Sequence, residues 1–339
     1  MNTGRSHRSI STITGPADRR RSRRDILKLA VAGGAALAAT GASRTSPLVN
    51  RTAAQEAGSP QPRPQTVLAN DVELGYVAAG RGDPVIFVHG SLNDLRSWGL
   101  QLGPFAERHR TIAYSRRYHW PNHRAATAGE AYAARLHADD LAGLIEALAV
   151  GPAHVVGSSY GALVGLLLAA RKPELVRSLV LGEPPLLTWL GQVPDGPAIL
   201  GAFAASTWEP ARQALADGDV ETGVRLFLDG AVGPGTYDQL PSSAQTMMLE
   251  NAPAMGLETS TPLETYVSAF SRADAAKIER PALLLTGEFS PAVFKTIDDE
   301  LARHLAGAER VMISRSSHVQ HVANPLAYNA AVLDFLATH

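Results

Sequence analysis

Residues 154–162 read HVVGSSYGA, and this stretch carries most of the information about the fold. The apolar residues before Gly157 predict a strand, and the apolar residues after Gly161 predict a helix. Glycine on both sides of the turn leaves room for the strand and the helix to pack closely. A G-x-S-x-G turn in this context is a nucleophile elbow, which holds a serine hydroxyl, here that of Ser159, above the edge of a sheet.

Strand and helix patterns alternate on both sides of this turn. Helical spacing covers 132–148, and continuous apolar strands are predicted at 84–90, 110–115, 176–181, 282–287 and 310–313. Such an alternation predicts an α/β fold with a mainly parallel sheet and helices on both faces. Residues 186–274 interrupt it with short helical patterns and no strong strand, so we interpret them as a helical cap inserted into a core formed by 66–185 and 275–339.

The composition is that of a globular protein with neither metal nor cofactor motifs. The 339 residues are 45% hydrophobic and 19% charged, which is enough for one large domain with an insertion. The absence of cysteine excludes disulfides, a thiolate nucleophile and thiolate metal ligands. The sequence has no H-E-x-x-H motif and no glycine-rich dinucleotide fingerprint, so we expect no metal and no cofactor.

The amino-terminal segment differs in charge from the rest of the chain. Residues 1–42 hold eight Lys or Arg against two acids, and Arg23-Arg24 precedes an apolar run that is too short to span a bilayer. This resembles a twin-arginine signal, so we expect a signal peptide at 1–42, a flexible linker at 43–65, and export to the periplasm or beyond by the twin-arginine machinery without a stable membrane anchor. The remaining 23 basic and 30 acidic residues leave a net charge of −7, which argues against nucleic-acid binding.

Residues 66–339 resemble an α/β-hydrolase with a helical cap. The resemblance rests on His89-Gly90 at a strand end, on the elbow at Ser159 and on His318 in a loop near the carboxyl terminus. It implies that Ser159 is a nucleophile and that His318 is its base, because a serine hydroxyl needs a base within hydrogen-bond reach. We expect His137, His154, His304 and His321 to be packing or surface residues.

The acid behind the histidine departs from the usual pattern of the family. Ser290 stands where many members carry an aspartate, and serine cannot stabilise an imidazolium as a carboxylate can. Glu183 follows the strand after the elbow helix, an arrangement similar to that of certain haloalkane dehalogenases and of zearalenone-type lactone hydrolases. We therefore predict Glu183 as the acid, with Glu288 as the alternative, and place 298–300 (Asp-Asp-Glu) on a solvated helix face.

Two further groups of residues are predicted near the serine. The amides of Ser91 and Tyr160 are expected to form the oxyanion hole. Arg117, Tyr118 and Trp120 follow a strand at the expected mouth of the site, where they would bind an anionic or aromatic group of the substrate. The alternative is a packed loop whose arginines pair with acids.

The resemblance implies a serine hydrolase that cleaves a carboxylic ester or lactone through an acyl-enzyme. Met and aromatic residues in the cap favour a small, apolar substrate. One alternative is a cofactor-free perhydrolase of the haloperoxidase type, which would use the same residues for a different acyl acceptor. Another is a non-enzymatic binding module with an inactive site, which Ser290 alone favours.

Overall fold

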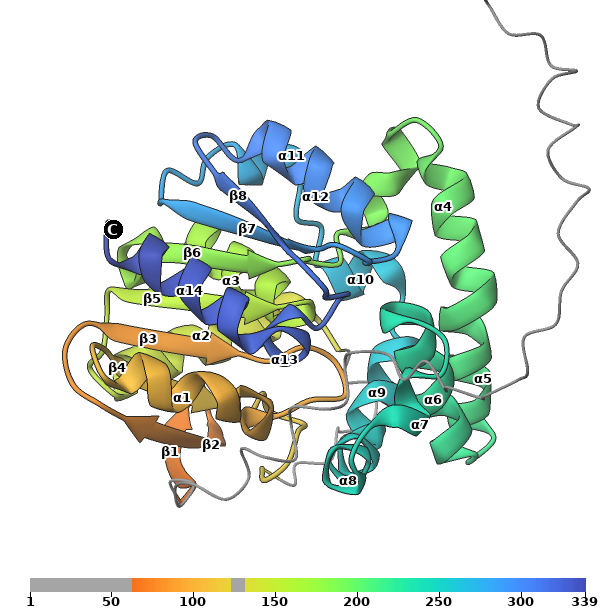
Figure 1. Cartoon of the computed structure of the whole chain (residues 1–339), viewed down its shortest axis with the longest axis horizontal. Helices are drawn as coiled ribbons and strands as arrows, with labels where there is room; N and C mark the ends of the chain where they lie inside the picture. Colours follow the sequence, from red (N-terminus) through yellow and green to blue (C-terminus); the bar gives the residue numbers. More distant parts are fainter. Residues whose placement is uncertain (1–62, 123–131) are drawn as a thin grey trace, which may run out of the picture. The chain divides into compact units, whose positions relative to one another are not determined.

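Eight strands form one sheet with the order β1-β2-β4-β3-β5-β6-β7-β8, and the six strands predicted above are β3 to β8 (Figure 1). The computed structural model describes residues 63–122 and 132–339, so the expected signal peptide and all but the last three residues of the expected linker lie outside the described residues. The strands are β1 (Gln65–Ala69), β2 (Val72–Ala79), β3 (Pro84–Val88), β4 (Arg110–Tyr114), β5 (Ala153–Ser158), β6 (Val176–Gly182), β7 (Ala282–Gly287) and β8 (Glu309–Ile313).

Most of this sheet is parallel. Strand β2 pairs antiparallel with β1 and β4, and every other neighbouring pair is parallel. All six residues of β5 and of β7 are buried, as expected for strands that are covered on both faces. The prediction of a mainly parallel α/β sheet is therefore confirmed.

Helices pack on both faces of the sheet because successive strand residues point to opposite sides. In β3, Ile86 and Val88 belong to one hydrophobic core, whereas Phe87 belongs to the other. The first core includes residues of α2 (Ala134–Ala147), α3 (Tyr160–Arg171), α11 (Arg272–Ala275) and α12 (Ala292–His304). The second includes residues of η1 (Leu95–Trp98), α1 (Gly99–Ala106) and α14 (Pro325–Leu336). Short helices η2 (Pro173–Leu175) and α13 (Gln320–Ala323) complete this part of the chain.

A run of helices separates β6 from β7 and lies beyond the carboxyl ends of the parallel strands (Figure 1). We call this run the cap. It comprises η3 (Leu187–Gln192), α4 (Gly196–Phe203), η4 (Ala204–Trp208), α5 (Glu209–Ala216), α6 (Val220–Val232), α7 (Thr236–Gln239), α8 (Ser242–Glu250), α9 (Ala252–Ser260) and α10 (Leu263–Val267). Among the described residues, no helix has both the length and the apolar character needed to cross a membrane.

Candidate active site

Ser159 occupies a strained turn between β5 and α3. Its φ of 53° and ψ of −120° are rare for a residue with a side chain, and such strain persists only where the surrounding packing imposes it. The packing here is very tight. A Cβ at Gly161 would lie 2.1 Å from the carbonyl oxygen of Val88, and one at Gly157 would lie 2.5 Å from the amide of Ala162. The two glycines therefore allow the turn that presents the serine hydroxyl.

Three side chains form a continuous hydrogen-bonded line from this hydroxyl into the protein. Ser159 Oγ lies 2.9 Å from His318 Nε2, and His318 Nδ1 lies 2.6 Å from Glu183 Oε2. Glu183 is fully buried, and its other oxygen accepts a hydrogen bond of 2.8 Å from the amide of Gly287. This geometry can orient a neutral imidazole to accept the serine proton and can stabilise the imidazolium that results.

The ring of His318 is also held from one side. The ring of Phe294, at the start of α12, stacks on it with a centroid distance of 3.6 Å and an interplanar angle of 14°. The stacked ring and the Glu183 carboxylate together restrict the imidazole to one orientation, so it needs little rearrangement before proton transfer.

Glu288, the alternative acid of the sequence analysis, has a different partner. Its Oε2 accepts a hydrogen bond of 2.8 Å from the amide of Arg315. Ser290 is buried, and its hydroxyl has no hydrogen-bond partner. In this structure the carboxylate that contacts His318 is thus the one at the end of β6.

A second buried carboxyl lies near Glu183. Asp298, on α12, is fully buried and its Oδ2 lies 2.6 Å from the hydroxyl of Thr286. Burial raises the pKa of Asp298 well above its usual value, and the nearby charge of Glu183 raises it further. The prediction of a solvated face at 298–300 is wrong for Asp298 and for the largely buried Glu300, because α12 packs them against the core.

The loop after β3 passes directly beside Ser159. A Cβ at Gly90 would lie 3.1 Å from the Cβ of Ser159, and the next residue, Ser91, lines the same pocket as Ser159 and His318. His89 holds this loop: its Nδ1 donates to the carbonyl of Gly90 (2.8 Å) and its Nε2 accepts from the amide of Arg116 (2.9 Å). Burial lowers the pKa of His89 well below its usual value, so the ring is a neutral structural group.

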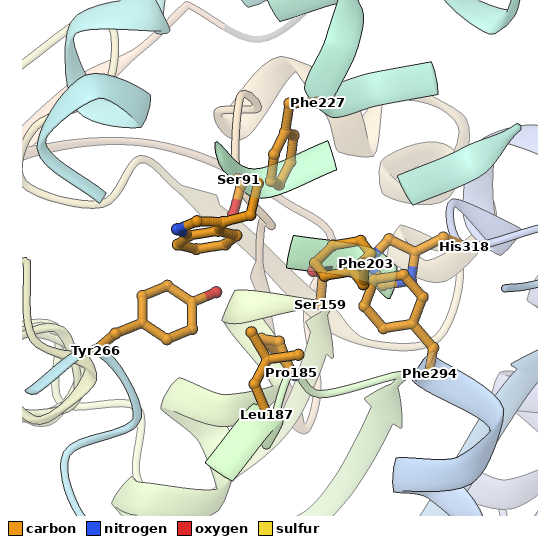
Figure 2. Close-up of a pocket in the computed structure, with 10 residues that line it drawn as sticks. Ser91, Ser159, Pro185, Leu187, Phe203, Phe227, Tyr266, Phe294 and His318 are labelled. Atoms are coloured by element: carbon orange, nitrogen blue, oxygen red, sulfur yellow. Dashed lines mark hydrogen bonds between the residues drawn. The ribbon is translucent and has the colours of Figure 1, made fainter. Parts of the chain in front are cut away.

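The pocket above Ser159 is small and mostly apolar. Five cap side chains, together with Phe294, surround the serine and histidine (Figure 2). The empty space between the lining side chains is about 260 Å³, and this figure includes the open mouth. The lining consists of Ser91, Ser159, Pro185, Leu187, Phe203, Trp208, Phe227, Tyr266, Phe294 and His318. An apolar cap can be predicted from the sequence, but the cap residues that line the pocket cannot, because their convergence depends on how short helices pack.

The predicted substrate-binding residues Arg117, Tyr118 and Trp120 are not part of this lining. The guanidinium of Arg117 binds the buried carboxylate of Asp140 with N–O distances of 2.7 and 2.5 Å. The ring of Trp120 lies 4.0 Å from the guanidinium of Arg96. The structure thus places the first two of these side chains in buried positions of a packed loop.

Three of the histidines expected to be packing or surface residues have partners other than Ser159. His321 stacks on Trp98 with a centroid distance of 4.3 Å, and burial lowers its pKa to about 3. His154 Nδ1 lies 2.7 Å from the hydroxyl of Ser178, and His304 Nε2 lies 3.3 Å from Glu300. Within 63–122 and 132–339, no group of three or more His, Asp or Glu side chains could hold a metal ion.

A serine–histidine–carboxylate line at the carboxyl ends of a parallel sheet, beneath a helical insertion, defines the class of α/β hydrolases. The sequence model of the alpha/beta hydrolase fold family matches residues 83–325, and the chain belongs to this family.

Several known proteins are similar over most of the chain. The (E)-2-((N-methylformamido)methylene)succinate hydrolase of Acinetobacter baylyi is 24% identical over 80% of this chain and 97% of its own length. A Mycobacterium tuberculosis protein assigned by name to the non-heme bromoperoxidases, BpoC, is 26% identical over 79% of this chain and 98% of its own. The crystal structure of the enol-lactonase from Burkholderia xenovorans LB400 superposes with a TM-score of 0.65 at 21% identity, covering 80% of this chain and all of that one. The structural likeness shows the fold.

Proposed function

We propose that the protein is a serine hydrolase that cleaves a small, mainly apolar carboxylic ester or lactone. The observation that supports this most directly is the line Ser159–His318–Glu183, whose serine end opens into the pocket. The apolar walls favour an uncharged substrate, and the limited space favours a small one.

In the proposed reaction, Ser159 Oγ attacks the substrate carbonyl while His318 Nε2 takes the hydroxyl proton. The oxygen of the tetrahedral intermediate becomes negatively charged, and the amides of Ser91 and Tyr160 are the proposed donors to it. His318 then gives its proton to the leaving alkoxide, which leaves an acyl group on Ser159. Water activated by the same imidazole releases the acid, and Glu183 stabilises the imidazolium in both halves of the reaction.

A panel of short p-nitrophenyl esters and simple lactones tests this proposal. The wild type should turn over at least one of them, and its Ser159 should react with a fluorophosphonate, seen as a mass increase of the intact protein. A wild type that neither labels nor hydrolyses would favour a non-enzymatic binding module instead.

The similarity to BpoC favours a second candidate, acyl transfer to hydrogen peroxide in place of water. Both reactions share the acyl-enzyme, so they differ only in the acceptor. Perhydrolysis and hydrolysis of one ester should be compared at equal concentrations of enzyme, with monochlorodimedone bromination reporting the peracid. A peracid yield that depends on Ser159 would support the second candidate.

We also propose export by the twin-arginine machinery, on the basis of Arg23-Arg24 and the apolar run that follows. The test is to express the full chain and the double variant Arg23→Lys, Arg24→Lys and to assay ester hydrolysis in cell fractions. Export by this route predicts that the ester-hydrolysis activity of the full chain lies outside the cytoplasm and that the activity of the double variant stays in the cytoplasm.

A further inference from the structure

Glu258 in the cap is a fully buried carboxylate that touches the core beside the nucleophile. It lies on α9, and its Oε1 accepts a hydrogen bond of 2.5 Å from the hydroxyl of Ser91, which lines the pocket. Carboxylates are rarely buried completely unless a charge or several donors compensate them. The hydrogen bond between Glu258 and Ser91 therefore joins the cap specifically to the loop at 89–91.

The compensating charge is Arg116, which holds the same loop from the other side. Arg116 is fully buried, and it donates from Nε to the carbonyl of His89 (3.2 Å) and from Nη2 to that of Gly90 (3.0 Å). Attraction between Arg116 and Glu258 opposes the effect of burial, which raises the pKa of Glu258. Arg116 of the core thus binds His89 and Gly90, and Glu258 of the cap binds Ser91, so that two opposite charges hold three consecutive residues next to Ser159.

The other groups around Glu258 are phenols. Tyr132 precedes α2 and Tyr266 belongs to α10, and their hydroxyls favour the ionised carboxylate. Tyr160, which opens α3, is the third ring of this group and packs against both of them in a tilted orientation. Oε2 of Glu258 has no hydrogen-bond partner of regular geometry, so Ser91 is the group that Glu258 holds most directly.

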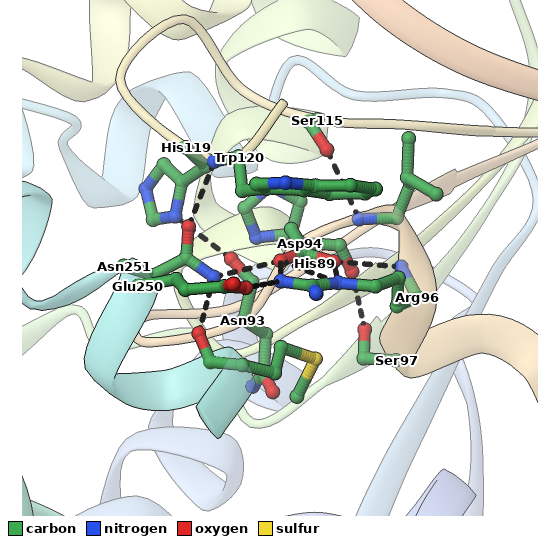
Figure 3. A network of polar contacts seen from close by, with 12 residues as sticks. His89, Asn93, Asp94, Arg96, Ser97, Ser115, His119, Trp120, Glu250 and Asn251 are labelled. Atoms are coloured by element: carbon green, nitrogen blue, oxygen red, sulfur yellow. Dashed lines mark hydrogen bonds and ion pairs between the residues drawn. The ribbon is translucent and has the colours of Figure 1, made fainter. Parts of the chain in front are cut away.

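The same part of the cap contacts the loop a second time, a few residues further along (Figure 3). Asn251, between α8 and α9, donates to Asp94 Oδ2 (2.8 Å) and accepts from the amide of Trp120 (2.9 Å). Asp94 in turn caps η1 through the amide of Arg96. The segment from Asn251 to Glu258 therefore fixes both ends of the stretch 91–94.

We propose that Glu258 is a positioning residue for the reaction: it fixes Ser91, and with it the amide of Ser91 beside Ser159, so that the oxyanion site is complete only when the cap is seated. This inference rests on the proposed function. An oxyanion donor acts only at a distance of about 2.7–3.1 Å from the developing charge, so a small displacement of the loop weakens it. Displacement of the loop should therefore weaken stabilisation of the transition state and leave substrate binding unchanged.

The test compares Glu258→Gln, Ser91→Ala and the double variant in ester hydrolysis. Ser91→Ala keeps the backbone amide and both buried charges, so it remains informative if Glu258→Gln fails to fold. Glu250→Gln is the matched control, since Glu250 is another carboxylate of the cap but pairs with Arg96 where the two side chains are 40% and 32% exposed. Exposed pairs contribute little, so the control should behave as wild type.

Each single variant should lower kcat by about tenfold or more with KM within about twofold, because only transition-state stabilisation is lost. The inhibition constant of a trifluoromethyl ketone, which forms a tetrahedral adduct with Ser159, should rise by the same factor as kcat falls. The double variant should lose little more than either single variant, since the two residues act through one contact. Unchanged melting temperatures would exclude general unfolding.

Two outcomes would overturn the inference while the wild type remains active: an unchanged kcat in both single variants, or an increase in KM alone. A wild type that neither hydrolyses esters nor reacts with a fluorophosphonate would overturn the proposed function, and the positioning role with it.

Discussion

Replacing Glu183 by glutamine removes the charge behind His318 while it preserves the size of the side chain. The structure shows why the amide cannot serve both partners of the carboxylate. One oxygen accepts from the amide of Gly287 (2.8 Å) and the other from His318 Nδ1 (2.6 Å), so the site needs two acceptors. A glutamine supplies only one acceptor and one donor.

Either orientation of the new amide is unfavourable. If its nitrogen faces His318, the imidazole is driven to the tautomer that carries its proton on Nε2, which cannot accept from Ser159. If its nitrogen faces Gly287, two buried donors meet, at a cost of about 1–3 kcal/mol, and the imidazolium still lacks its counter-charge. We expect kcat to fall by about 10³-fold, or about 4 kcal/mol of transition-state stabilisation.

The assay is steady-state hydrolysis of the best ester by wild type, Glu183→Gln and Glu288→Gln. Glu288 is the matched control because its carboxylate accepts from the amide of Arg315 and not from His318. Its variant should keep kcat within about twofold of wild type, as is usual for substitutions outside a site. A large loss in Glu288→Gln together with near-normal turnover in Glu183→Gln would refute the assignment.

Three further substitutions have defined outcomes. Ser159→Ala should abolish ester turnover and fluorophosphonate labelling without lowering the melting temperature; residual turnover near the wild-type rate would exclude Ser159 as the nucleophile. Because the folded-state pKa of Asp298 is raised, its contribution to stability is fully present below the unfolded-state pKa and is lost as pH rises. Asp298→Asn should therefore raise the melting temperature at pH 8 and give no gain below pH 4. A gain that is independent of pH would contradict this. Arg117→Leu should destabilise the fold by about 3–5 kcal/mol, since it leaves the buried Asp140 without its cation, while KM stays unchanged; a raised KM at normal stability would instead support substrate binding by Arg117.

Local sequence determined the features that depend on neighbouring residues. The turn around Ser159 needs a strand, two glycines and a helix that follow one another in the sequence, so it could be predicted from residues 154–170. The buried strands were equally predictable, because complete burial requires continuous apolar runs. The packing of His321 also followed from sequence reasoning, and its stacking on Trp98 agrees with it.

Tertiary structure decided the features that depend on distant segments. Glu183 and Glu288 both follow strand ends, and only the pairing of β6 with β7, which sets Gly182 opposite Leu285, brings Glu183 to Gly287 and His318. The burial of Asp298 depends on how α12 packs on the core, which a run of three acids does not reveal. Glu258 went unnoticed because its partner, Ser91, belongs to a distant strand end.

The physical reason for this division is the range of the interactions. A backbone turn and the burial of a strand are encoded by the residues that form them, so the sequence by itself determined the turn that holds Ser159 and the buried strands of the sheet. Three features arise where separate elements meet: the identity of the carboxylate that contacts His318, the shape of the pocket, and the contact between the cap and the loop at 89–91. Those features depend on packing angles and strand register, which only the folded chain specifies.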